Sequence, residues 1–527
     1  MKNKTLLVNF ALILLLFTVS VIVRKDNLQA PIGRHHEWLT GHVLGTVEVL
    51  QENGIAYHHH SPVFTFNAKA DKYLVSSQKF KDSNNYAYYV SYPPACFLLP
   101  YCIFNLSGQK ASVTGIRIIS LLNHFLCALL VYLLVLRIFR KKIKQDFFIP
   151  AFIAYTMYLF ATGNLWFHAH VYFADMQVHL FILTALYVTY SLFDNPEYKF
   201  RLKLLILGAA TFMGVYTEWL AVFIAFFTAG FFLLLSFKNR KFLYPFLIIC
   251  CCTLAPMLLT VYQYSRIAGL EPLKEHLTNK FMARSGYDKE AAYGGMSIHS
   301  KVARAKLFSN YETNYDELLD FAWLSLYVLA FVLLVRNIRE KAPFTKNHFR
   351  LFAIVFLAII IHHIVFFNFT VVHDFSGFKC SLLLPLFIAY CFGLLFVAIA
   401  GKYEKVCAIT MSLVCIYFVH FSIQKYYKVN PLDWRTNLQR DIGEEIEANS
   451  TEDEVIFAKA YVTPEISWYA KRNVVEIGSI EDAKKFLKQM NYKRGHYVEV
   501  KFDDTKYLIN SYRIVNDTTV QKIKAQF

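Results

Sequence analysis

Long apolar runs recur along this chain, and they constrain its fold more than any other feature. A helix that crosses a bilayer needs roughly 20 consecutive apolar residues. Such runs lie near residues 5–23, 112–138, 147–166, 174–193, 204–217, 220–237, 242–264, 317–335, 351–368, 379–400 and 405–424. The sequence therefore predicts an α-helical polytopic membrane protein with about eleven transmembrane helices.

Composition agrees with this class. Hydrophobic residues make up 56% of the 527 residues, and charged residues only 18%, whereas soluble domains carry about 25% charged residues. The net charge is +17, but Lys and Arg cluster in short loops between apolar runs, as expected for a membrane protein. We therefore expect no nucleic-acid partner. Nearly all of the ten cysteines lie in apolar sequence, which predicts buried thiols rather than a disulfide framework.

The basic clusters also predict the orientation. Clusters follow the second, fourth, sixth, eighth and tenth runs, and Lys2 and Lys4 precede the first. All of them fall on one side if the N-terminus is cytoplasmic, and an odd number of spans then places the C-terminus outside. We expect a multi-pass protein of the cell inner (plasma) membrane. The first run is expected to remain as an anchor, because it is longer than a usual signal-peptide core and no convincing cleavage site follows it.

Three long segments then lie outside the membrane, near residues 24–111, 265–316 and 425–527. Long ordered loops usually carry function. We divide the chain into a transmembrane catalytic domain, 1–424, and an extracytoplasmic α/β domain, 425–527. In the first outer segment, Tyr92-Pro93-Pro94 opens an apolar stretch that is too short to span, so we expect it at the interface or as a re-entrant segment.

The C-terminal region alternates helices with strands. Expected helices cover 432–448, 464–471 and 479–490, and expected strands cover 454–458, 473–477 and 497–502. This alternation favours a parallel sheet. There is no Gly-rich phosphate loop, so we expect no nucleotide site.

The densest polar cluster is Gly33-Arg34-His35-His36-Glu37-Trp38, shortly beyond the first apolar run. A helical run from Leu39 to Leu50 follows, so Glu37 is expected near a helix N-terminus at the outer membrane face. A carboxylate there could be the general base for an acceptor hydroxyl or amine. The alternative is a contact with the helix dipole.

Two further carboxylates lie at expected helix ends. Asp175 stands at the outer start of a span, where an acidic residue is either functional or a helix cap, and the two roles are compatible. Glu218 lies in the polar turn Tyr216-Thr217-Glu218-Trp219 and is either solvated or faces the space between spans.

The cations that could hold a phosphate lie in outer segments. Lys379 opens the tenth span, a few residues after Asp374, and could bind a lipid phosphate or extend its ammonium to the interface. Arg284 and Arg266, in the second outer segment, are weaker candidates.

A metal site is not the expectation. His58, His59 and His60 form a run, and His35, His36, His168 and His170 also face outward in this topology. Side chains of neighbouring residues in an extended chain point apart, so adjacent histidines rarely converge on one ion. A divalent metal stays possible without direct support, and we predict no cofactor.

The order of these features resembles GT-C type glycosyltransferases, in particular the branch with protein O-mannosyltransferases and lipid A aminoarabinose transferases. This family has an acidic pair after the first span, then a helix ending at glycine, a Pro-Pro pair and an Asp at a later span. A Gly-rich helix with a polar turn, a basic residue before a Pro-containing run and a C-terminal α/β domain follow. The matching positions here are His36-Glu37 through Gly54, Pro93-Pro94, Asp175, 208–235, Lys379 to Pro385 and the tail.

The resemblance implies an inverting transfer of a sugar from a polyprenyl-phosphate donor to a glycolipid, polysaccharide or protein acceptor at the outer face. Its implied catalytic residues are Glu37, His36 and Asp175. Arg34, Lys379, Asp374, Glu218 and Arg284 would bind substrate. The family pair is usually Asp-Glu, and His36 stands here in the Asp position, so either Glu37 or His36 takes the base role. Relatives often have Lys where this chain has Glu218.

Other classes predict different features. A transporter or flippase would favour inverted repeats and helices broken near the midplane, and the sequence shows no convincing repeat. A lipid-linked glycan ligase or polymerase would depend on outer arginines and histidines. A structural membrane protein would need none of these side chains.

Overall fold

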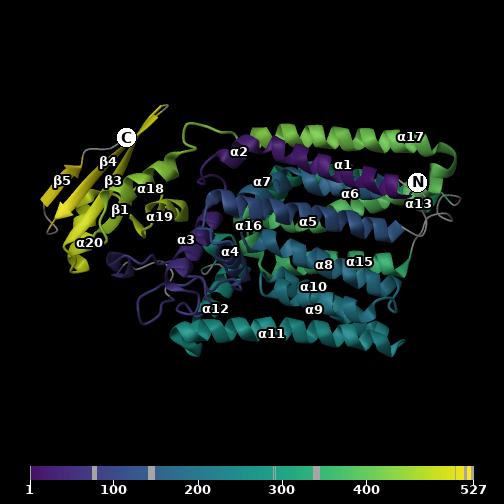
Figure 1. The fold of residues 1–527 in the computed structure, drawn as a ribbon, viewed down its shortest axis with the longest axis horizontal. Helices are drawn as coiled ribbons and strands as arrows, with labels where there is room; N and C mark the ends of the chain where they lie inside the picture. Colours follow the sequence, from purple (N-terminus) through teal and green to yellow (C-terminus); the bar gives the residue numbers. More distant parts are fainter. Residues whose placement is uncertain are drawn as a thin grey trace.

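The computed structural model describes residues 2–73, 80–139, 149–288, 290, 292–335, 345–504, 506–515 and 519–523. A long helical bundle occupies one end of the molecule, and a small sheet domain lies at the other (Figure 1). The expectation of an α-helical membrane protein with a C-terminal α/β domain is confirmed.

Helices make up most of the first half of the chain. Its helices are α1 (Lys2–Val23), α2 (Lys25–Gln29), α3 (Trp38–Asn53), α4 (Ala95–Leu106), α5 (Val113–Phe139), α6 (Ile149–Phe160), α7 (Thr162–His170), α8 (Ala174–Asp194), α9 (Phe200–Val215) and α10 (Leu220–Ser236), with the short 3₁₀ turns η1 (Lys69–Tyr73) and η2 (Arg240–Phe242). The second half adds α11 (Leu243–Ala268), α12 (Leu270–Ser285), η3 (Tyr293–Gly295), α13 (Lys301–Leu334), α15 (Lys346–Val365), α16 (Phe367–Val372), η4 (Asp374–Leu382) and α17 (Leu384–Val429).

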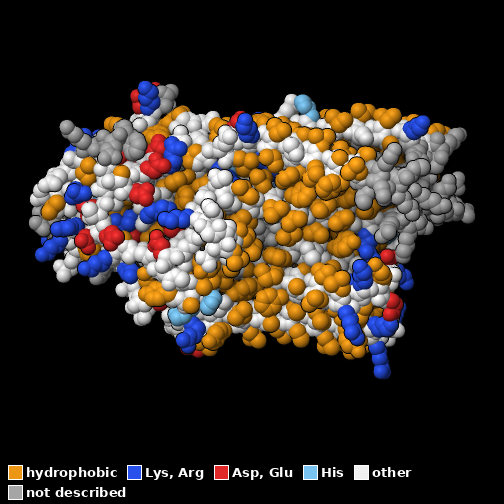
Figure 2. All heavy atoms as spheres, viewed as in Figure 1, with side chains coloured by type: hydrophobic (Ala, Val, Ile, Leu, Met, Phe, Trp, Pro, Cys, Tyr) orange, Lys and Arg blue, Asp and Glu red, His pale blue; other side chains and the backbone are white. Residues whose placement is uncertain are grey.

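Seven helical stretches among the described residues are long and apolar enough to cross a membrane, and four further apolar helices are shorter. The predicted number of eleven spans therefore stays a prediction. Figure 2 shows hydrophobic side chains over most of the visible face of the bundle, with charged side chains gathered at its two ends. The apolar stretch after Pro94 is the twelve-residue helix α4.

The predicted span 147–166 is not one helix. The chain leaves helical geometry at Ala161, with φ −51° and ψ 133°, and α7 begins there in a new direction. The freed backbone groups find side-chain partners: Glu317 accepts from the Thr162 N–H at 2.6 Å, and Asn164 donates to the Tyr158 carbonyl at 2.7 Å. Polar partners of this kind permit a broken helix inside a protein core.

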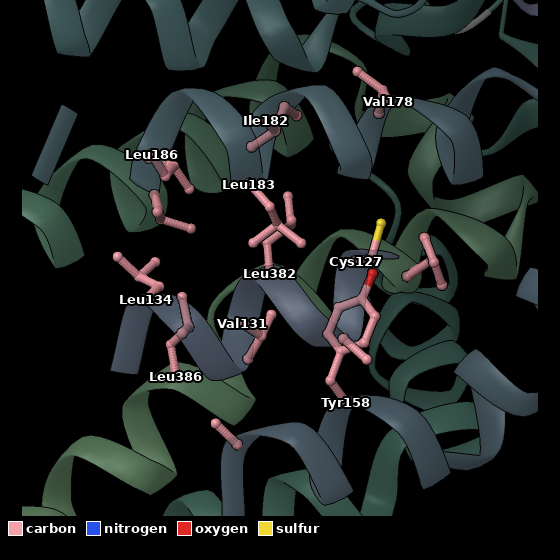
Figure 3. Packing of buried hydrophobic residues seen from close by; sticks show 14 of the residues in the cluster. Cys127, Val131, Leu134, Tyr158, Val178, Ile182, Leu183, Leu186, Leu382 and Leu386 are labelled. Carbon is pink, nitrogen blue, oxygen red and sulfur yellow. The ribbon is translucent and has the colours of Figure 1, made fainter. Parts of the chain in front are cut away.

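The core lies around α6, of which every residue is buried. This helix packs between α5 and α17. Figure 3 shows branched side chains of α5 and α8 interlocking with Leu382 and Leu386, while the Tyr158 hydroxyl points to Cys127. Lipid offers no hydrophobic drive for helix association, so this tight packing holds the bundle together.

The tail domain, residues 430–523, contains α18 (Leu438–Asn449), α19 (Pro464–Ala470) and α20 (Ile480–Gln489) with the strands β1 (Val455–Lys459), β2 (Val474–Glu476), β3 (Arg494–Asp503), β4 (Lys506–Val515) and β5 (Thr519–Ile523). The sheet order is β2-β1-β3-β4-β5. The expected parallel pairing holds for β2, β1 and β3. The prediction omitted β4 and β5, which add antiparallel hairpin partners and make the sheet mixed.

The tail domain is docked on the first outer segment. At Gly41 in α3, an added Cβ would lie 2.8 Å from the backbone nitrogen of Glu465 in α19, so only glycine permits this approach. Arg472 forms a buried ion pair with Asp71 at 3.2 Å, and Asn473 accepts from the Phe66 N–H at 2.8 Å. These contacts fix the position of α3 and of the loop that follows it.

Candidate active site

Glu37 lies at the start of α3 in a completely buried ion pair. Arg117 of α5 donates to one carboxylate oxygen at 2.8 Å, and the backbone N–H groups of Gly33 and Arg34 donate to the other at 3.1 and 3.0 Å. The Arg34 side chain lies 3.7 Å away and stacks on Trp166. Both carboxylate oxygens of Glu37 therefore already accept hydrogen bonds within the protein. This arrangement favours a structural role at the start of α3 over that of a general base.

His36 and Asp374 form a second group with His35. The His36 Nε2 lies 2.5 Å from one Asp374 oxygen, and the His35 Nε2 lies 2.9 Å from the other. Asn314 of α13 donates to the same carboxylate at 2.9 Å. We call His35, His36 and Asp374 the histidine–aspartate cluster. It is the one group of metal-ligand type found among the described residues, with its ligand atoms within 4.8 Å of one another.

The two adjacent histidines converge because His36 has a left-handed backbone, with φ 58°. This conformation is uncommon outside glycine and turns the chain sharply between the two residues. Their rings lie 4.2 Å apart. The expectation that neighbouring histidines point apart assumed extended backbone and is wrong at this position.

The cluster is open to solvent on one side. The side chain of His35 is 48% exposed, and those of His36 and Asp374 are 14% and 15% exposed. Burial lowers the pKa of His36, although its hydrogen bond to Asp374 acts in the opposite direction. Burial lowers the pKa of the neighbouring His373 to about 3, so that imidazole is neutral.

Asp175, Lys379 and Tyr92 form a third group, deeper in the molecule. The Lys379 ammonium lies 2.5 Å from an Asp175 oxygen, and the Tyr92 hydroxyl donates to the other oxygen at 3.3 Å. Lys379 and Asp175 are both completely buried. Asp175 begins α8 and Lys379 belongs to η4, so this pair joins two elements across the core.

Arg284, at the end of α12, borders this group. It donates to the Ser91 carbonyl at 3.1 Å and to the Tyr89 hydroxyl at 3.4 Å, and its guanidinium lies 4.9 Å from the centre of the Tyr92 ring. No carboxylate of a described residue lies within 4.0 Å of it. Arg284 is partly exposed, so it is a cation with unused capacity for an anion.

Glu218 is buried in the turn between α9 and α10. It accepts from the Leu220 N–H at 2.6 Å, lies 3.4 Å from His362 and interacts electrostatically with Lys379. We call Asp175, Lys379, Tyr92, Arg284 and Glu218 the buried ion cluster.

Aromatic rings separate the two clusters. The Phe369 ring lies 5.1 Å from the Arg284 guanidinium and 5.7 Å from the Lys379 ammonium. The same ring lies 4.8 Å from His373, whose ring is 6.3 Å from that of His36. Asp374 and Lys379 belong to the same 3₁₀ segment, η4, which therefore supplies one charged side chain to each cluster.

The eight predicted site residues thus fall into three groups. Arg34 and Glu37 share the ion pair with Arg117, His36 and Asp374 meet in the histidine–aspartate cluster, and the remaining four meet in the buried ion cluster. Arg117 was not among the predicted site residues, although an arginine inside an apolar run signals a buried partner. Tyr92 and Asn314 were not predicted either, and no comparable sequence signal exists for them.

Comparisons with known proteins find a fold but no sequence relative. No family model matches the chain, and no curated protein matches it. Solved structures do match. The oligosaccharyltransferase AglB of Archaeoglobus fulgidus, solved with an inhibitory peptide and a dolichol-phosphate, has a TM-score of 0.55 at 13% identity over 93% of this chain and 69% of its own. A crystal structure of the oligosaccharyltransferase from this archaeon, with Zn and sulfate, has a TM-score of 0.55 at 14% identity. It covers 92% of this chain and 67% of its own.

The ArnT of Cupriavidus metallidurans, bound to undecaprenyl phosphate, matches over 96% of this chain and 97% of its own, with a TM-score of 0.51 and 10% identity. Both proteins are GT-C glycosyltransferases. This structural similarity confirms the GT-C fold that was expected from the sequence.

Proposed function

We propose that this protein is an inverting glycosyltransferase that moves a sugar from a polyprenyl-phosphate donor to an envelope acceptor at the outer membrane face. The observation that carries the proposal is the placement of η4, which supplies Asp374 to the histidine–aspartate cluster and Lys379 to the buried ion cluster, with Phe369 close to both. The GT-C fold supports it, because the similar structures hold dolichol-phosphate and undecaprenyl phosphate.

The buried ion cluster is assigned to the carrier phosphate. Arg284 has no carboxylate partner among the described residues. Lys379 adds a second positive charge, 5.7 Å from the Phe369 ring. As the bond between the anomeric carbon and the phosphate oxygen breaks, negative charge develops on the leaving phosphate. Fixed cations stabilise that charge without reorganisation. Lys379 is closed off here, so the partly exposed Arg284 is the group that meets the phosphate first.

The histidine–aspartate cluster is assigned to the acceptor. Its partial exposure lets an acceptor hydroxyl or amine approach, and the cluster receives the proton that leaves as the new bond to the anomeric carbon forms. Of the two candidate positions for the base, this cluster replaces Glu37, because both oxygens of Glu37 already accept hydrogen bonds.

We place the tail domain outside the cytoplasm, beside the acceptor cluster. Tyr469 of the tail domain accepts a hydrogen bond from the Ile32 N–H at 3.0 Å. The domain, docked on α3, thereby holds the segment from Ile32 to Trp38. The tail domain therefore positions His35 and His36 although it supplies neither.

A flippase is the alternative that the fold alone leaves open. Mass spectrometry of lipid-linked sugars and envelope glycans from cells with and without the protein tests whether the sugar is lost, and sugar transfer by the purified protein in detergent, where there is no membrane to cross, excludes a flippase. A transferase predicts a glycan or glycolipid lighter by one sugar in the deletion strain, with accumulation of the polyprenyl-phosphate sugar. Unchanged glycans and lipid-linked sugars contradict the proposal.

A further inference from the structure

The histidine–aspartate cluster holds more ligating capacity than a proton transfer requires. Two imidazole nitrogens and a carboxylate from segments far apart in the sequence meet within 4.8 Å. We propose that His35, His36 and Asp374 bind one divalent transition-metal cation, and the ligand set favours Zn²⁺. This inference rests on the proposed function for its role but not for its chemistry.

The ligand set matches an open zinc site. Catalytic zinc sites use three protein ligands of His, Asp, Glu or Cys and leave the fourth position to water or substrate. Zinc lies about 2.0–2.2 Å from such nitrogen and oxygen atoms, so the three ligands must draw closer than their present spread. His35 is the most exposed of them and is free to make that movement.

A supporting shell is already present. The Asn314 amide donates to Asp374 at 2.9 Å and fixes the orientation of its carboxylate. The left-handed backbone at His36 holds the two imidazoles on one side of the chain. Groups that orient ligands in this way typically change metal affinity by about 10–100-fold.

The hydrogen bonds of His36 give the metal-free form a defined tautomer. Its Nε2 carries the proton and donates to Asp374, while its Nδ1 accepts from the Trp38 indole N–H at 3.3 Å. A metal at Nε2 requires the proton at Nδ1 instead. The Trp38 indole then loses its acceptor, so metal binding has a spectroscopic signature in the tryptophan fluorescence.

The cluster is exposed mainly at His35, so an acceptor that approaches from solvent would meet the open fourth position of such a site. A bound cation lowers the pKa of a hydroxyl that it contacts and orients it for attack. The metal would therefore act on the acceptor, while Arg284 and Lys379 act on the carrier phosphate.

The test uses the full-length protein in detergent, stripped with a chelator and titrated with ZnCl₂ by calorimetry, with the metal content measured by mass spectrometry. Co²⁺ absorption reports ligand geometry. His36→Asn is the main variant, because Asn tolerates the left-handed backbone but is a poor zinc ligand. Asp374→Asn keeps the shape of the carboxylate. His299→Ala removes an exposed histidine of another outer segment and is the matched control.

We expect one Zn²⁺ per chain in the wild type and in His299→Ala, with a change in tryptophan fluorescence. We expect at least a hundredfold loss of affinity in His36→Asn and Asp374→Asn. Zinc should raise the melting temperature of the wild type only, and the metal-free variants should melt near the metal-free wild type.

Two results overturn the inference. One is equal zinc binding by the wild type and His36→Asn, and the other is absence of zinc binding by the wild type. If the protein without zinc still transfers sugar in an Asp374-dependent manner, the proposed function stands and the metal has no part in the transfer. If the wild type binds zinc, the His36 and Asp374 variants do not, and no sugar transfer is found, the metal site is supported and the proposed function fails.

Discussion

The ammonium of Lys379 lies 2.5 Å from a carboxylate oxygen of Asp175, and solvent reaches neither side chain. Breaking a buried pair by removing one partner costs about 3–5 kcal/mol, because the remaining charge stays buried without compensation. We expect Asp175→Asn and Lys379→Met each to lower the melting temperature of the purified protein strongly and to abolish transfer. Thermal unfolding and a transfer assay on the same preparations check this.

The double variant Asp175→Asn/Lys379→Met separates stability from function. Removing both charges relieves the cost of the unpaired one, so the melting temperature should recover above that of either single variant. Sugar transfer should stay lost, because the Lys379 ammonium is missing. Restored transfer in the double variant would show that the pair only supports the fold.

Arg284 should contribute directly to binding of the carrier phosphate. A hydrogen bond to a charged group contributes about 1.5–3 kcal/mol, which corresponds to about a ten- to hundredfold change in affinity. Arg284→Gln should weaken binding of undecaprenyl phosphate by this factor, measured by native mass spectrometry. Arg266→Gln changes an exposed arginine at the end of α11 and should bind as the wild type does.

Glu37 and Asp374 should respond differently to substitution. Glu37→Gln removes a charge from the pair with Arg117, so we expect a lower melting temperature while folded molecules keep more than about a tenth of the transfer rate. Asp374→Asn should keep the melting temperature but lose about 10²–10⁴-fold in rate, the usual contribution of a general base. The reverse pattern would return the base role to Glu37.

Docking of the tail domain depends on Gly41. An added methyl group would meet the Glu465 nitrogen at 2.8 Å and the Pro464 carbonyl carbon at 3.0 Å, both backbone atoms that cannot rotate away. Gly41→Ala should destabilise the protein by about 1–3 kcal/mol and reduce transfer, because the segment carrying His36 shifts. Gly230→Ala, at a helical glycine with open space around it, should leave both unchanged or raise stability slightly.

The same interface should respond to pH through Glu465. Burial, together with the charge of Glu37, raises the pKa of Glu465 to about 8, and one of its oxygens has no hydrogen-bond partner among the described residues. A carboxyl group whose pKa is raised on folding contributes stability that is complete below its unfolded pKa and is lost as the pH rises through about 8. The melting temperature of the wild type should therefore fall between pH 6 and pH 9 more than that of Glu465→Gln, as measured by thermal unfolding across this range. Parallel curves for the two proteins would contradict this assignment.

The sequence predicted a polytopic membrane protein, because the length and apolar composition of a run directly determine whether it can span a bilayer. It did not predict the break at Ala161, since the Thr162 N–H freed there is satisfied by Glu317, which lies 155 residues away. The parallel strands of the tail were predicted, whereas β4 and β5 were missed, because 506–515 shows no regular alternation of apolar and polar residues.

The candidate site was predicted as a set of residues but not as an arrangement. Glu37 pairs with Arg117, 80 residues away, and His36 reaches Asp374, 338 residues away. Sequence spacing carries no information on such contacts. The left-handed backbone of His36 is also a property of the folded turn, and it decides that two adjacent histidines meet one carboxylate.

The most direct test uses the donor that should accumulate in a strain lacking this protein. Polyprenyl-phosphate sugar extracted from that strain is mixed with its envelope acceptor and with purified wild-type protein, Asp374→Asn or Arg284→Gln, and both lipids and glycans are followed by mass spectrometry. We expect the wild type to consume the donor, to release one polyprenyl phosphate per sugar added, and to exceed both variants in rate at least tenfold. Consumption at equal rates by all three proteins, or no consumption by the wild type, would contradict the proposed function.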